Sequence, residues 1–114
     1  MDIKEETLEL VNKIKETQEY IDYLNYRSIL ERNEELLCQV EEFRRKNFEI
    51  QVSHHYGAYN AYENLISLKQ DYEELLSEPT VKMFLDAELK FSKLMTSVYD
   101  TITEKIEFDT HFLE

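Results

Sequence analysis

Apolar side chains recur along this chain at intervals of three and four residues, the spacing that places them on one face of an α-helix. The longest such pattern follows Pro79, which suits the first turn of a helix because that turn needs no hydrogen bond from its N–H, and Ser77 or Glu78 can cap it. Its apolar positions are Val81, Phe84, Leu85, Phe91, Leu94, Met95, Val98, Ile102 and Ile106. We predict one long amphipathic helix from residue 79 to 106.

Two shorter apolar stripes lie before residue 32. Asp2 can cap a first helix, and the apolar phase shifts near Thr17, which is a second possible cap. The first stripe consists of Ile3, Thr7, Leu8, Val11 and Ile14, and the second of Tyr20, Tyr23, Leu24, Tyr26 and Leu30. The pattern predicts two short helices, or one bent helix, over residues 3 to 31.

A third amphipathic segment begins at Asn33, a capping residue followed by the acidic first turn that a helix dipole favours. Its seam consists of Leu36, Val40, Phe43, Asn47, Ile50 and His54, with the heptad rhythm of helices that pack lengthwise. Asn47 either sets the register of such packing or is a partly exposed amide, and the sequence leaves both open. The sole glycine, Gly57, marks the end or a bend of this helix.

The apolar rhythm resumes after Asn60, which has Glu63 three residues on, as in a variant of the capping box. Ala61, Leu65, Leu68, Tyr72 and Leu75 form this stripe. With one Gly, one Pro and a third of its 114 residues charged, the chain has few turns and long helices. We predict a single all-α domain over residues 1–114, an antiparallel bundle of about four or five helices, with 107–114 as a flexible tail.

The predicted packing surfaces hold more apolar area than a small monomer readily covers, since further apolar side chains flank the main seams: Phe48, Val52, Phe91 and Met95. We therefore expect a homodimer or higher oligomer. The residues predicted for helix packing or for the oligomer interface are Leu36, Val40, Phe43, Phe84, Phe91, Leu94 and Val98.

Composition favours protein partners in the cytoplasm. The formal net charge of −12 opposes direct contact with nucleic acid or an anionic membrane. The only cysteine, Cys38, cannot form an internal disulfide, and the charged start of the chain does not resemble a secretory leader. No apolar run approaches the roughly 20 residues that span a bilayer, so we expect a soluble protein.

Residues with reactive side chains do not form a catalytic or metal-binding motif. His54 and His55 are adjacent and point to different helix faces, and Cys38 lies among carboxylates that disfavour a thiolate. Paired acids such as Glu41 and Glu42 are typical of a solvated helix face. We expect no enzyme activity, no metal and no cofactor.

Tyr56, Tyr59 and Tyr62 recur every three residues at the predicted break. Aromatic side chains can stack on bases, but basic residues are almost absent nearby, which favours helix packing or a protein partner surface. Three alternatives stay open: an assembly module without a regulatory role, an RNA-binding protein using the basic run 43–46, and an enzyme site assembled across a dimer.

The order and spacing of several segments resemble the YlbF/YmcA family of small helical bacterial proteins. The segments are Thr-Gln-Glu-Tyr-Ile-Asp-Tyr (17–23), Asn-Glu-Glu (33–35), Phe-Arg-Arg-Lys (43–46), His-Tyr-Gly (55–57) and Glu-Pro-Thr-Val-Lys-Met-Phe-Leu-Asp-Ala-Glu (78–88). The resemblance covers about residues 8 to 106.

This resemblance implies a non-enzymatic regulator that acts in a cytoplasmic complex with family paralogues and a further protein, YaaT. Such complexes influence competence, sporulation and biofilm formation, and are linked to RNA processing by RNase Y. Better-studied members carry a cysteine-containing C-terminal extension connected with iron–sulfur binding. This sequence lacks it after residue 106, so we expect no cluster here.

Overall fold

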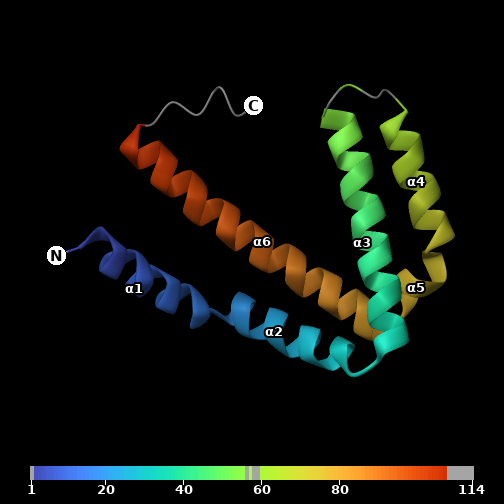
Figure 1. The fold of residues 1–114 in the computed structure, drawn as a ribbon, viewed down its shortest axis with the longest axis horizontal. Coiled ribbons are helices and arrows are strands. Elements are labelled where there is room, and N and C mark those ends of the chain that lie inside the picture. The colour runs from blue at the N-terminus through green and yellow to red at the C-terminus, as the bar shows by residue number, and fades with distance from the viewer. Residues whose placement is uncertain (1, 56, 58–59, 108–114) are drawn as a thin grey trace. The chain divides into compact units, whose positions relative to one another are not determined.

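The chain folds into helices joined by short turns (Figure 1). The computed structural model describes residues 2–55, 57 and 60–107, and all of these side chains except that of His54. Their helices are α1 (Ile3–Lys15), α2 (Gln18–Glu31), α3 (Glu34–His55), α4 (Ala61–Asp71), α5 (Glu73–Ser77) and α6 (Pro79–Ile106). No strand occurs in these ranges. The all-α prediction is confirmed, and the described part holds six helices where four or five were expected.

Thr17 separates the first two helices, so the segment 3–31 forms two helices and not one. Its Oγ1 donates a hydrogen bond of 2.6 Å to the carbonyl of Ile14 at the end of α1. The same oxygen accepts a bond of 3.3 Å from the N–H of Tyr20 in the first turn of α2. One short polar side chain therefore satisfies backbone groups at both helix ends, which a continuous helix would not need.

The caps predicted for the other helices are formed in all but one case. Asp2 accepts a bond from the N–H of Lys4, and Asn33 accepts one of 3.1 Å from Leu36. The Glu78 carboxylate accepts a bond from Val81, and Pro79 is the first residue of α6, as its missing N–H requires. The capping box predicted at Asn60 is wrong, because that side chain makes no capping bond although α4 begins directly after it.

Asn33 precedes α3 and caps it, whereas Asn60 precedes α4 and makes no capping bond, so substituting each of them tests the assigned caps. Asn33→Ala should lower the free energy of unfolding by about 1 kcal/mol, because it removes the acceptor for the first turn of α3. Asn60→Ala should have a much smaller effect, because no side-chain bond is lost. Urea denaturation of both variants measures the difference. Equal losses would contradict the assigned role of Asn33.

A second difference from the sequence pattern lies at Tyr72. The stripe from Ala61 to Leu75 predicts one helix, but the chain leaves helical geometry at Tyr72 (φ −108°, ψ 18°) and resumes it in the five-residue α5. The ring of Tyr72 lies against Phe43, with 5.5 Å between ring centroids, and its hydroxyl accepts a bond from Lys46. Contacts with a distant helix therefore accompany this break, and a periodicity within one segment cannot reveal them.

The described residues form two compact units. The first contains residues up to Asn25 together with those from Asp86 onward, and the second contains Tyr26–Leu85. α2 and α6 each contribute to both units. That the whole chain behaves as one domain stays a prediction.

The second unit holds most of the apolar core. Within it, α3 and α4 pack side by side as an antiparallel pair (Figure 1). Its buried apolar residues are Leu30, Val40, Phe43, Ala61, Leu68, Leu75, Val81 and Phe84. The guanidinium of Arg44 covers the ring of Phe84 at 5.9 Å from its centroid.

In the first unit, α2 contacts the middle of α6 through aromatic rings. Phe91 of α6 lies 5.3 Å from Tyr20 and 5.5 Å from Tyr23, measured between ring centroids, and the Tyr23 ring is stacked on it. Such aromatic pairs add to the stabilisation that burial provides. They account for the half-buried state of all three side chains.

Candidate interaction surface

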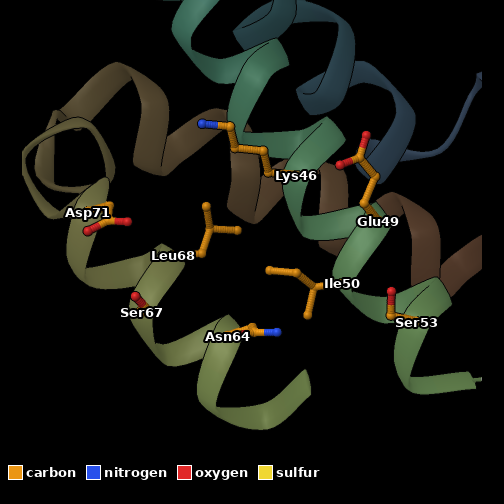
Figure 2. Close-up of a pocket in the computed structure, with 8 residues that line it drawn as sticks. All are labelled: Lys46, Glu49, Ile50, Ser53, Asn64, Ser67, Leu68 and Asp71. Atoms are coloured by element: carbon orange, nitrogen blue, oxygen red, sulfur yellow. The ribbon is translucent and has the colours of Figure 1, made fainter. Parts of the chain in front are cut away.

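A groove between α3 and α4 has apolar side chains at its centre and polar ones around them (Figure 2). Ile50 of α3 and Leu68 of α4 point toward one another in its middle. The surrounding residues are Lys46, Glu49, Ser53, Asn64, Ser67 and Asp71. The volume is about 400 Å³, which accommodates a side chain of a partner protein. An apolar centre with a polar rim is the usual composition of a protein-binding surface.

A neighbouring hollow of about 400 Å³ continues this surface toward the end of α3 and the start of α4. Ile50 lines both hollows, and Leu65 and Ala61 add apolar surface to the second. Tyr62 borders it and is 71% exposed. Aromatic residues are enriched at protein interfaces relative to the rest of a protein surface, so this exposed ring beside an apolar hollow is a candidate partner contact. We call the two hollows together the α3/α4 groove.

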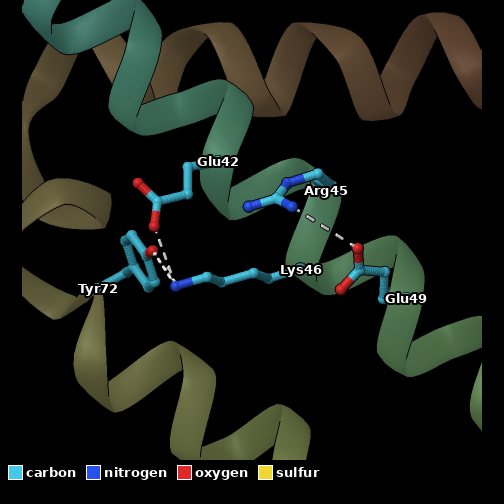
Figure 3. Close-up of polar contacts among 5 residues, drawn as sticks. All are labelled: Glu42, Arg45, Lys46, Glu49 and Tyr72. Atoms are coloured by element: carbon cyan, nitrogen blue, oxygen red, sulfur yellow. Dashed lines mark hydrogen bonds and ion pairs between the residues drawn. The ribbon is translucent and has the colours of Figure 1, made fainter.

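Beside the groove, Lys46 connects α3 to the residue that separates α4 from α5 (Figure 3). Its ammonium donates a hydrogen bond of 2.9 Å to the Tyr72 hydroxyl and lies 3.0 Å from the Glu42 carboxylate. The same ammonium is 5.2 Å from the centroid of the Tyr72 ring. Three side chains from two regions of the chain thus hold α3 against the α4–α5 turn.

These contacts shift the pKa values of both charged groups. Hydrogen bonds from Lys46 and from the Tyr72 hydroxyl lower the pKa of Glu42 below 4.5, because they stabilise the carboxylate. Hydrogen bonds to Tyr72 and Glu42 raise the pKa of Lys46 above 10.5, because they stabilise the ammonium. Both groups are solvent-screened, so the stabilisation is modest.

The shifts predict a pH dependence for Glu42→Gln. A carboxyl whose pKa is lowered in the folded state contributes stability above its unfolded pKa and loses it as pH falls through its folded pKa. The variant should therefore be less stable than the native chain at pH 7, and the difference should disappear as pH falls below about 4.5. Chemical denaturation across pH 3 to 8 measures this.

Glu41→Gln is the control, because it removes the same formal charge from the adjacent position of α3. With a net charge of −12, loss of any carboxylate also relieves repulsion. The contribution of the Glu42–Lys46 contact is therefore the difference between the free energies of unfolding of the two variants. Identical pH profiles would show that the contact with Lys46 contributes nothing.

The sequence pattern pointed only partly to this cluster. It placed Tyr72 in an apolar seam and Lys46 in a basic run, and it did not connect them. The spacing of Glu42 and Lys46, four residues apart on one helix, was a signal for their ion pair. The role of Tyr72 had no local signal, because its partner lies 26 residues away.

The seven residues predicted for helix packing or an oligomer interface fall into two groups. Val40, Phe43 and Phe84 are buried in the second unit, where they contribute to the core of the single chain. Leu36, Phe91, Leu94 and Val98 are half-buried. Their part in an oligomer stays a prediction.

Of the three tyrosines predicted to contact a partner, only Tyr62 falls within the described ranges, and Tyr56 and Tyr59 lie outside them. Tyr62 is exposed at the α3/α4 groove. The position is compatible with a partner surface, which remains a prediction for all three residues.

The sequence from residue 3 to 107 matches the family model described as control of competence regulator ComK, YlbF/YmcA. The chain belongs to the YlbF/YmcA family. This confirms the resemblance found in the order and spacing of its segments.

Two bacterial relatives of this family member are similar over most of their length. A UPF0342 protein of Caldicellulosiruptor bescii is 26% identical over 100 residues, which cover 88% of this chain and 84% of the relative. A UPF0342 protein of Desulfitobacterium hafniense is 27% identical over 106 residues, which cover 93% and 86%. No solved structure gives a significant match.

The family description concerns regulation of competence and names no reaction. Within the described ranges of this YlbF/YmcA chain, no group of three or more His, Cys, Asp or Glu residues is arranged to hold a metal ion. Cys38 is exposed, with a free thiol. Among those residues there is also no helix that could cross a membrane.

Proposed function

We propose that this YlbF/YmcA protein is a cytoplasmic regulatory adaptor that acts by binding another protein and not by catalysis. The observation that carries the proposal is the family match over residues 3–107, because the family is described by its control of a competence regulator. Competence, sporulation, biofilm formation and RNase Y-dependent RNA processing are the regulated processes that the resemblance implies. The partners we propose are family paralogues or the ribonuclease machinery.

We place the partner contact at the α3/α4 groove. Ile50, Leu65 and Leu68 offer an apolar floor, Tyr62 is an exposed anchor, and Lys46 and Asp71 stand at the rim. Interfaces of this kind draw most of their affinity from a few aromatic or apolar anchors in a desolvated centre. The surrounding charges then select the partner and its orientation.

Two measurements test this function. The first is the effect of deleting the gene in its native host on competence-gene transcripts and on RNase Y-dependent processing, with the native gene as the complementing control. The second is the affinity of the purified chain for each partner recovered with it. Tyr62→Ala should weaken that affinity by at least tenfold and reproduce the deletion phenotype, because truncating an aromatic anchor that a partner covers costs that much.

Phe48→Ala is the matched control, since Phe48 is 66% exposed on α3 and does not line the groove. This variant should bind and complement like the native chain. A deletion that leaves transcripts and development unchanged would contradict the regulatory role. If the chain recovers only itself, the assembly module without a regulatory role replaces the adaptor.

A further inference from the structure

A third hollow extends the α3/α4 groove toward the α4–α5 turn. Its volume is about 520 Å³, and it shares Asp71 with the hollow that is centred on Ile50 and Leu68. Six of the α3 residues that line these two hollows recur at intervals of three or four, so they lie along one side of that helix. They are Leu36, Gln39, Glu42, Lys46, Glu49 and Ser53. The two hollows therefore form one continuous trough between α3 and the α4–α5 segment.

Carboxylates dominate the charge of this trough. Five of its lining residues carry a carboxylate and one carries an ammonium. Among the described residues, none that lines the third hollow is basic, and its carboxylates belong to Glu42, Asp71, Glu74 and Glu78. We call it the acidic hollow. Like charges gathered along a concave surface raise the local concentration of the opposite charge, so the trough attracts cations and repels anions.

Contacts within the chain leave two of these carboxylates without a partner. Lys46 lies 3.0 Å from Glu42 and is held there (Figure 3), so its ammonium does not offset the remaining acids. The Glu78 carboxylate caps α6 through a backbone hydrogen bond. By contrast, the exposed side chains of Asp71 and Glu74 form no hydrogen bond or ion pair with any other described residue. These two carboxylates are therefore available to a cation from outside the chain.

The walls of the acidic hollow fit an organic cation with an apolar stem. Leu75 is 9% exposed and Leu36 is half-buried, so apolar surface lies beside the carboxylates. Arg and Lys side chains combine an apolar stem with a charged tip, and they match both parts of this surface. A bare metal ion would use only the carboxylates, and within the described ranges these are not arranged to hold one.

The trough places apolar and acidic contact points at a defined separation. Ile50 and Leu68 point toward one another in the first hollow (Figure 2), and Gln39 is the middle α3 residue of the acidic hollow. The 11 residues from Gln39 to Ile50 correspond to about 16 Å along α3. A partner helix that lies lengthwise in the trough would therefore carry an apolar anchor and a basic residue about three helical turns apart.

We propose that the partner enters the α3/α4 groove with a basic amphipathic helix. Its apolar side chains pack on Ile50 and Leu68, and its Arg or Lys side chains enter the acidic hollow beside Asp71 and Glu74. The inference rests on the proposed adaptor function and names the chemical class of the segment that the adaptor binds. The same carboxylates reject an acidic segment, because like charges brought together across an interface are unfavourable.

Two model peptides test this charge selection on the full chain. Both are blocked helical peptides of Ala and Leu with one Trp among the apolar positions. The first carries Arg residues at one end, and the second carries Glu at the same positions. Because this chain contains no Trp, Trp fluorescence anisotropy reports the peptide alone. The Arg peptide should bind at least tenfold more tightly than the Glu peptide, and its affinity should fall as the salt concentration is raised.

Charge reversal in the chain tests where the Arg side chains bind. Asp71→Lys combined with Glu74→Lys should weaken binding of the Arg peptide at least tenfold and strengthen binding of the Glu peptide by a similar factor. The gain excludes misfolding as the cause, because a misfolded chain would not acquire a new preference.

Glu41→Lys combined with Glu73→Lys is the matched control for this reversal. It makes the same change in net charge at exposed residues that line none of the three hollows. This control variant should keep the native preference for the Arg peptide.

Three results would overturn the proposal. One is equal affinity of the native chain for the Arg and Glu peptides. Another is an affinity for the Arg peptide that falls equally in the two doubly substituted variants, because net charge alone would then explain it. The third comes from an Arg peptide with Ser in place of every Leu, which should bind at least tenfold more weakly. Unchanged affinity for that peptide would show that the apolar surface of the trough contributes nothing.

The adaptor function itself is tested separately, by gene deletion and by Tyr62→Ala. A partner whose binding depends on Tyr62 and not on Asp71 and Glu74 would refute the basic helix and leave the adaptor function standing. A deletion without a phenotype would refute the adaptor function, whatever the two peptides show.

Discussion

Phe84→Ala should lower the free energy of unfolding by about 3 to 5 kcal/mol, the range for truncating a buried phenylalanine. Phe84 is 3% exposed in the core of the second unit, and the Arg44 guanidinium covers its ring. The substitution removes apolar contacts and leaves a cavity that the packed helices fill only in part. Urea denaturation at a single low protein concentration measures the loss, because self-association would make stability depend on concentration.

Phe48→Ala makes the same chemical change on α3 at a side chain that is 66% exposed. This variant should change the free energy of unfolding by no more than about 0.5 kcal/mol, as most surface substitutions do. The contrast tests burial alone, since both residues lie within helices. Similar losses at the two positions would show that Phe84 is not part of the core.

Val40→Asp should destabilise the chain at least as much as Phe84→Ala does. We expect it to lower the free energy of unfolding by about 3 to 5 kcal/mol at pH 7, or to unfold the chain completely. Val40 is 1% exposed, so the new carboxylate would be removed from water and placed among apolar core residues. Burial disfavours the charged form, and the folded-state pKa of the new carboxyl should therefore rise. The destabilisation should decrease as the pH is lowered and that carboxyl becomes protonated.

Val52→Asp is the control on the same helix, at a side chain that is 36% exposed. This substitution should lower the free energy of unfolding much less than Val40→Asp and with little pH dependence, because the carboxylate can remain hydrated. Circular dichroism and urea denaturation at pH 4 and pH 7 distinguish the two variants. A Val40→Asp chain with native stability at pH 7 would contradict the assigned core.

The all-α class and most helix boundaries were predictable because their causes are local. Asn33 caps α3 through its own first turn, and Pro79 begins α6 because its missing N–H is tolerated there. The family resemblance was likewise carried by the order of short segments, and the match over residues 3–107 confirmed it. Each signal depends on residues within a few positions of one another.

Local patterns gave wrong predictions where the structure depends on contacts between segments that are distant in the sequence. Tyr72 had the spacing of a helix seam, yet the chain breaks there, where it contacts Phe43 and Lys46. Asn60 had the sequence of a capping residue but makes no capping bond. The α3/α4 groove was also invisible in the sequence, since its two sides are separate helices, and Tyr62 was the only described lining residue predicted to contact a partner.

The sequence by itself determined which segments are helical, where most of them begin, and which faces are apolar, because capping and amphipathic spacing act between near neighbours. Only the tertiary structure decided which apolar faces are buried within the chain. Val40 and Phe84 are buried in the second unit, whereas the equally regular stripe of α1 has no buried member. Periodicity specifies that a face is apolar, but burial depends on which other segment packs against it.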